Sequence, residues 1–278
     1  MPLLSEKEVF RLKLNTIPTS ILRDLAKSRN IFKQKVSDIV EELIGNSISP
    51  IEIDDLIRLN YRNQIKVRQS VISDSQVLNE LNLVEEFNWG VVQGQLDSKI
   101  QANYVRKYPK YYDLLRNIKS TLHNEITNYV ICTWYNHWST ILIEDFISQH
   151  PKVVPTLKNV KGVDIFFDGQ PFDLKITYLP IGFHQTISDA IREPKNLIIW
   201  LYENQGEQRF GSENRLFVIL YDENKPIESW KIKRDIYFVQ SKINQFFESE
   251  KITKNDEIVF QFNRNTYNAI SKILFITK

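Results

Sequence analysis

Two aspartates and one lysine, Asp164, Asp173 and Lys175, have the residue types and the spacing for metal-dependent chemistry. They alternate with apolar residues in the stretch from residue 163 to 177. Two carboxylates at close range repel, and one of them is driven toward protonation unless a cation lies between them. Mg²⁺ suits such a gap because it takes one or two carboxylates and keeps water molecules that a phosphate can replace. The lysine can neutralise excess charge, hold a phosphate oxygen, or align or deprotonate a water molecule on the metal.

A β-hairpin is the element that would bring these three side chains together. The apolar runs on either side of Asp168-Gly169 read as strands, and this dipeptide is a two-residue turn sequence that tolerates positive φ. The turn sets a register in which Asp164 lies opposite Asp173, with Lys175 on the same face. The alternative is a buried ion pair within the hairpin and one aspartate in solvent, because short Asp-x-Lys strings are common.

The order Asp164, eight intervening residues and then Asp173-Leu174-Lys175 resembles the PD-(D/E)xK nuclease superfamily, which includes most type II restriction endonucleases. Val163 stands where the family name has proline. The resemblance implies an α/β, restriction-endonuclease-like core, in which a mixed central sheet is flanked by helices. It also implies that both aspartates are catalytic metal ligands, that the lysine is the active-site lysine, and that Mg²⁺ is the cofactor.

A long helix is expected directly before the hairpin, over residues 123–149. Its sequence is rich in large apolar residues, but one face carries a polar stripe: Thr133, His137, Thr140 and Glu144. The resemblance covers about residues 144 to 220, and many members of the family carry an extra acid on this helix. Glu144 is the matching position and would be a third catalytic carboxylate for the metal or its water. The alternative is a glutamate at the rim, in solvent.

Candidate DNA-binding residues lie in basic or polar stretches outside the hairpin. Between residues 98 and 120, cations alternate with tyrosines, a combination suited to phosphates and sugars. This stretch could equally be a solvated helix face with core tyrosines. A polar segment between two expected strands, 196–202 and 215–221, could read bases or could be a solvated loop. The candidates are Arg106, Lys107, Lys110, Gln205, Arg209, Arg215, Lys231 and Lys233.

The rest of the chain divides into a helical N-terminal region, residues 1–86, and the nuclease core, residues 87–278. One helix is expected to end near Gly45, and another begins at Pro50 and runs to about Tyr61. The pair could be a helix-turn-helix or an ordinary helical hairpin on the core. Further expected elements are a short helix from Thr186, a helix at 239–248, and strands at 257–262 and 273–277.

Composition narrows the functional classes. The formal net charge is only +2, so any affinity for nucleic acid must come from local patches. The single cysteine allows no internal disulfide and fits a reducing cytoplasm. The first ten residues do not resemble a signal peptide, and no apolar run approaches the ~20 residues needed to span a bilayer. No membrane association and no nucleotide cofactor are expected.

These observations predict a Mg²⁺-dependent endonuclease that hydrolyses DNA phosphodiester bonds. The resemblance implies a sequence-specific type II restriction endonuclease that acts on double-stranded DNA, and by the same analogy a homodimer, because two sites are needed to cut two strands. A repair, homing or transposition-type nuclease is the first alternative, and a DNA-binding module that does not cleave is the second. A glycosidase also holds two nearby carboxylates, but Lys175 on the same face and the basic clusters argue against it.

Overall fold

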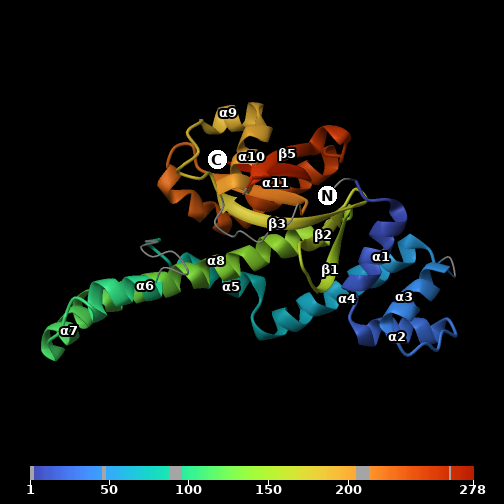
Figure 1. Ribbon diagram of the computed structural model, residues 1–278, viewed down its shortest axis with the longest axis horizontal. Helices are drawn as coiled ribbons and strands as arrows, with labels where there is room; N and C mark the ends of the chain where they lie inside the picture. Colours follow the sequence, from blue (N-terminus) through green and yellow to red (C-terminus); the bar gives the residue numbers. More distant parts are fainter. Residues whose placement is uncertain (1–2, 46–47, 88–95, 205–212, 263) are drawn as a thin grey trace. The chain divides into compact units, whose positions relative to one another are not determined.

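The computed structural model describes residues 3–45, 48–87, 96–204, 213–262 and 264–278 of the chain (Figure 1). By contacts, the chain forms two compact units. The first unit combines Met1–Val71 with Ile143–Lys278, and the second is Ile72–Leu142. The division expected between residues 86 and 87 falls inside the second unit.

A mixed sheet forms the centre of the first unit, as expected. In the part of the chain that the structure describes, it has six strands in the order β1-β2-β3-β4-β6-β5. The pairs β1–β2, β2–β3 and β5–β6 are antiparallel, whereas β3–β4 and β4–β6 are parallel. The strands are β1 (Val153–Val160), β2 (Val163–Phe167), β3 (Gln170–Tyr178), β4 (Arg215–Tyr221), β5 (Glu257–Phe262) and β6 (Asn265–Thr277).

The β2–β3 hairpin has the predicted turn and register. Asp168 has φ 47° and Gly169 has φ 73°, so both turn residues adopt the left-handed conformation that a tight hairpin turn needs. Phe167 pairs with Gln170 directly across the turn. The pairing then runs back to Ile165 and Phe172, and the next opposed positions along this register are 164 and 173.

Apolar helices cover both faces of the sheet. Strand alternation sends Leu216, Val218 and Leu220 of β4 into one core, together with the end of helix α8 (His123–Gln149) and with α11 (Ile236–Ser249). The intervening β4 residues, Phe217 and Ile219, enter a second core with α9 (Ile187–Arg192) and α10 (Pro194–Asn204). Layers of helices on both faces of a mixed sheet define an α/β unit.

The region predicted to be helical, residues 1–86, is helical in its described parts, and its part up to Val71 packs onto the first two strands. This part consists of α1 (Glu6–Thr16), α2 (Thr19–Ser28), α3 (Val36–Gly45) and α4 (Pro50–Val71). Their buried side chains form one core with Val154, Leu157, Val163 and Phe166 of β1 and β2. Helix α4 begins at Pro50 as expected, but it continues ten residues beyond Tyr61. These helices are therefore part of the same compact unit as the hairpin.

The strand expected at residues 196–202 is wrong, because this segment lies inside helix α10. Its buried residues are Leu197, Ile198, Leu201 and Tyr202, a spacing that puts them on one helical face. A short apolar run cannot be assigned to helix or strand by its pattern alone. Topology favours the helix, since β3 and β4 are parallel and a parallel pair needs a crossover connection.

Other elements agree with the expectations more closely. Helix α9 follows Thr186, whose side chain accepts a hydrogen bond from the backbone of Asp189 in a capping box. Helix α11, strand β4 and strand β5 lie where the sequence places them. Strand β6 is longer than the sequence pattern indicates, and β1 is an additional strand that the pattern does not predict. Short 3₁₀ segments, η3 (Pro226–Arg234) and η4 (Lys254–Asp256), complete the first unit.

The second unit is helical where it is described. It contains α5 (Asp74–Asn82), α6 (Leu96–Ile100), a π-helical turn η1 (Gln101–Val105), α7 (Tyr111–Asn117), a second π-helical turn η2 (Ile118–Leu122) and the first part of α8. The expected long helix at residues 123–149 is confirmed as α8. Throughout the described segments, no helix combines the length and the apolar character needed to cross a bilayer.

Candidate active site

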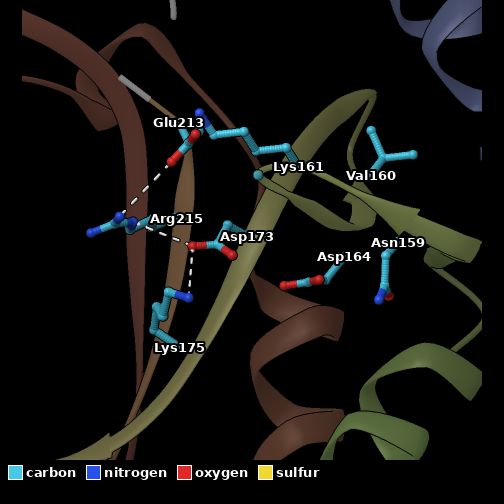
Figure 2. Close-up of a pocket in the computed structure, with 9 residues that line it drawn as sticks. Asn159, Val160, Lys161, Asp164, Asp173, Lys175, Glu213 and Arg215 are labelled. Atoms are coloured by element: carbon cyan, nitrogen blue, oxygen red, sulfur yellow. Dashed lines mark ion pairs between the residues drawn. The ribbon is translucent and has the colours of Figure 1, made fainter. Parts of the chain in front are cut away.

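The hairpin places the predicted aspartates and lysine on one cavity, shown in Figure 2. The Oδ2 atom of Asp173 lies 3.2 Å from Nζ of Lys175. Asp164 accepts a hydrogen bond of 2.8 Å from the backbone N–H of Leu174 on the facing strand. In Figure 2 both carboxylates point toward the same gap. The expected juxtaposition of two carboxylates and one ammonium is therefore present in the structure.

The cavity has a volume of about 370 Å³, large enough for a phosphate group and several water molecules. Its charged side chains are three acids and three bases, which balance formally. Parts of three chain segments form it: the β1–β2 turn, the β2–β3 hairpin and the start of β4. The lining residues are Asn159, Val160, Lys161, Gly162, Asp164, Asp173, Lys175, Glu213 and Arg215.

Arg215 also lines this cavity, although the sequence did not place it in the catalytic site. It pairs in register with Asp173 on the neighbouring parallel strand. Its Nε atom lies 3.4 Å from Oδ2 of Asp173, and one terminal nitrogen lies 3.9 Å from Glu213. The sequence pattern suggested that Arg215 reads bases, but in the structure it lies beside the hairpin acids. Only the pairing of β3 with β4 brings it there, and that contact is remote in sequence.

Burial changes the ionisation of Asp164. It raises the pKa of this carboxyl group above its usual range, and the nearby charge of Asp173 raises it further. The Leu174 N–H and the charge of Lys175 act in the opposite direction. The ionised form is thus disfavoured, as expected for two carboxylates that share a small, partly buried space.

Glu144 lies on a second cavity of about 240 Å³ that also contains Asp164. Burial raises the pKa of Glu144 to about 7, and repulsion from Asp164 adds to this effect. The charges of Lys175 and Lys233 favour the ionised form and limit the rise. The sequence left open whether Glu144 is a rim residue. It is half-buried, and the charge of Asp164 raises its pKa.

Lys233 is a buried cation whose charge acts on Glu144, rather than a surface cation. Only 2% of the residue is exposed. Burial lowers the pKa of its ammonium to about 7, and the charge of Glu144 works against that shift. The Nζ atom also lies 5.4 Å from the ring centroid of Tyr178. This position does not suit the phosphate contact expected from the sequence, since DNA could not reach the ammonium without a rearrangement.

Helix α4 of the N-terminal region forms one wall of the second cavity through Tyr61 and Gln64. It is fixed there by polar contacts with α8, since Tyr61 donates a 2.9 Å hydrogen bond to Asp145. A terminal nitrogen of Arg68 lies 2.8 Å from the other oxygen of the same carboxylate. These contacts hold α4 next to Glu144, the residue before Asp145. No sequence motif predicts that α4 contributes to the wall of this cavity.

The remaining DNA-binding candidates are dispersed. Arg106, Lys107 and Lys110 are exposed residues of the second unit. Lys231 lies on η3, where its Nζ atom is 2.9 Å from Glu228. Gln205 and Arg209 lie outside the described residues.

A glycine in the β1–β2 turn allows this turn to lie close to Glu213 at the edge of the cavity. Gly162 has φ 74°, and a Cβ atom at this position would lie 2.5 Å from Cγ of Glu213. The β1–β2 turn therefore approaches β4 as closely as it does because residue 162 has no side chain. The Lys161-Gly162 pair directly before the hairpin is the one local signal in the sequence for a turn and a preceding strand.

The donor set fits Mg²⁺ in type but supplies few ligands. Asp164 and Asp173 are oxygen donors, and Mg²⁺ is commonly held by one or two carboxylates with water completing its shell. Within the described ranges, no group of three or more His, Cys, Asp or Glu side chains is arranged to hold a metal. A metal at this site would also compete with Lys175 and Arg215 for the carboxylate of Asp173.

Chemically, the arrangement combines acids able to hold a divalent cation with bases able to hold an anion. Such a combination suits reactions in which charge develops on a phosphoryl oxygen. No family model, curated protein or solved structure matches the chain.

Proposed function

We propose that this chain is a Mg²⁺-dependent endonuclease that hydrolyses phosphodiester bonds of double-stranded DNA. The observation that carries the proposal is the hairpin, which brings Asp164 and Asp173 to one cavity with Lys175 beside the second acid. The cavity next to these residues has room for a phosphate. A cavity with two carboxylates, a lysine and an arginine is suited to a charged substrate more than to a neutral sugar.

Asp164 and Asp173 would hold Mg²⁺, which when bound supplies electrostatic stabilisation of charge on the scissile phosphate. Lys175 orients a phosphate oxygen or the attacking water through its compact ammonium. In the reaction, the water oxygen forms a bond to phosphorus while the bond from phosphorus to the 3′ oxygen breaks. The water loses a proton and the leaving oxygen gains one, so the products are a 5′-phosphate and a 3′-hydroxyl.

Glu144 is proposed to act from the second cavity as a residue that holds or moves a proton. A carboxyl group with a pKa of about 7 exchanges protons readily near neutral pH. Lys233 buried beside it provides a nearby charge whose state is also sensitive to pH. Proton release from the attacking water is the step that such a pair would assist.

A type II restriction endonuclease that works as a homodimer in the cytoplasm is the specific form of this proposal. Two copies of the site would cut the two strands of a palindromic target. Arg106, Lys107, Lys110 and Lys231 remain the proposed backbone contacts, because exposed or partly exposed cations neutralise phosphates. Discrete fragments from phage DNA would support a sequence-specific enzyme, and a smear would support a nonspecific nuclease.

The proposal is tested by nicking of supercoiled plasmid in Mg²⁺. Asp173→Asn and Lys175→Ala should each abolish nicking while retaining the thermal melt of a folded protein. Asp24→Asn and Lys27→Ala are matched controls, because both positions are exposed on α2, outside both cavities, and should leave nicking unchanged. Near-wild-type nicking by folded Asp173→Asn protein would rule out the proposed site. Binding to DNA without nicking by the wild type would favour a non-cleaving module.

A further inference from the structure

The guanidinium of Arg215 lies in the interior, at the inner side of the 370 Å³ cavity. Its side chain is 9% exposed, so it is more than nine-tenths buried. Its carbon Cζ lies 4.8 Å from the ring centroid of Tyr202, which covers it from one side. Tyr202 is fixed in turn by a hydrogen bond of 2.8 Å to the carbonyl of Glu213 and by stacking on Phe260. The guanidinium is therefore held in place before any ligand arrives.

The hydrogen-bonding capacity of Arg215 is not filled. Its Nε–H is buried and makes no hydrogen bond, although Nε is within ion-pair distance of Asp173. The contact with Glu213, at 3.9 Å, is also an ion pair at long range. A buried donor without an acceptor is unusual and costs stability, so it calls for an explanation. In this cavity, a ligand with oxygen acceptors would provide the missing partner.

The charge balance of the cavity indicates when that ligand would bind. Lys161, Lys175 and Arg215 offset the three acids, so the cavity without a metal has no formal excess of positive charge. A divalent cation on the two hairpin aspartates adds two positive charges. It also takes the carboxylate oxygens of Asp173 from the cations that contact them now. The arginine would then be free to bind an anion, and the cavity would carry a positive excess.

We propose that Arg215 exchanges partners: it is the counter-ion of Asp173 without metal, and it binds phosphate oxygens of the substrate once a divalent cation occupies the aspartates. This inference rests on the proposed function. It assigns to Arg215 a contact with phosphate oxygens instead of a contact with DNA bases. The planar guanidinium presents five donors in a fork that matches phosphate geometry, which a lysine cannot reproduce. Metal and phosphate binding should consequently be coupled.

The test compares Arg215→Gln, Arg215→Lys and wild type in two titrations. Calorimetry with Mg²⁺ alone measures metal affinity, and calorimetry with inorganic phosphate is run with and without saturating Mg²⁺. Wild type should bind phosphate measurably only with Mg²⁺. Arg215→Gln should bind Mg²⁺ several-fold more tightly, since a competing and repelling cation is gone, but should lose phosphate affinity by about tenfold or more. Arg215→Lys should retain near-wild-type metal affinity and still bind phosphate less well.

Arg192→Gln is the matched control, because Arg192 is exposed on α9 and pairs with Asp189 outside the cavity. It should change neither affinity. Thermal melts of every variant exclude unfolding, and Arg215→Lys retains a cation if Arg215→Gln fails to fold. Opposite changes in the two affinities would not result from a merely structural role, which would weaken both together. Unchanged or jointly weakened affinities in folded Arg215→Gln protein would overturn the inference.

The outcome can be separated from that of the proposed function. If wild type nicks DNA but Arg215→Gln shows no opposed changes, only the partner exchange fails. If wild type binds Mg²⁺ and phosphate cooperatively through Arg215 but never nicks DNA, the partner exchange stands and the nuclease proposal fails. If wild type neither binds Mg²⁺ nor nicks DNA, both fail.

Discussion

Replacing Glu144 with glutamine should stabilise the protein at alkaline pH much more than at acidic pH. Burial raises the pKa of Glu144 from its ordinary value of 4.5 to about 7. The folded state therefore disfavours the ionised form, and wild-type stability is lost as pH rises from about 4.5 through about 7. Glutamine has nearly the same shape and no charge, so it removes this loss. At pH 5, wild-type Glu144 is mostly protonated in the folded state, so the advantage of glutamine should be much smaller there.

The size of the effect follows from the same pKa values. A pKa change from 4.5 to about 7 corresponds to about 3 kcal/mol at pH values above 7. Between pH 5 and pH 8.5, the advantage of Glu144→Gln should therefore grow by about 2–3 kcal/mol as an upper limit. Lys233 does not remove this difference. At pH 8.5, well above a pKa of about 7, its ammonium has mostly lost its proton, so the glutamine variant leaves no buried cation unpaired there.

Urea unfolding followed by tryptophan fluorescence measures the difference, with a chelator present so that no divalent cation contributes. The free energy of unfolding is determined for wild type and Glu144→Gln at pH 5 and pH 8.5. Glu203→Gln serves as the control, since Glu203 is exposed on α10 and lines neither cavity. An equal effect of Glu144→Gln at both pH values would refute the description of Glu144 as a buried, protonatable acid.

Three further predictions concern stability and are read from urea midpoints. Gly162→Ala should destabilise more than Gly169→Ala, because both positions have positive φ, costing roughly 1–2 kcal/mol, but only the first brings a Cβ against Glu213. Equal losses of unfolding free energy in the two glycine variants would contradict the close approach of the β1–β2 turn. Asn214→Ala should lower the free energy of unfolding by about 1–3 kcal/mol for each buried group that it leaves unpaired, since this side chain donates a hydrogen bond to a β3 carbonyl and accepts one from a β6 amide. Arg68→Met should cost about 3 kcal/mol by leaving a buried carboxylate of α8 without its cation, and a neutral result would show that this ion pair does not hold α4.

Local sequence patterns predicted the elements whose geometry depends on near neighbours. The turn at Asp168-Gly169 sets the hairpin register within a few residues, so the sequence alone was enough to expect Asp164 and Asp173 close together. The long helix α8 has so many apolar residues over its 27 positions that the sequence predicted both of its ends. The capping signal at Thr186 was sufficient for α9 because it is complete within four residues.

Features that depend on remote pairing could not be predicted in this way. Nothing near Arg215 in sequence indicates that β4 lies beside β3, so its place next to Asp173 had no local signal. Lys233 appeared to be one of several cations in a basic cluster, and only tertiary packing buries it. The prediction for the segment that forms α10 was wrong for a different reason. Its local pattern fits both a helix and a strand.

The order of strands in the sheet also indicates when the cavity is completed during folding. Strands β1, β2 and β3 follow one another along the chain and pair antiparallel, so their contacts close short loops at low entropic cost. Strand β4 pairs with β3 only after the chain has crossed through α9 and α10. A nascent chain would therefore carry the hairpin, with Lys175 as the nearest cation for its aspartates, before Arg215 is available. The contact of the guanidinium with Asp173 is then among the late steps of folding, formed only when the parallel half of the sheet is in place.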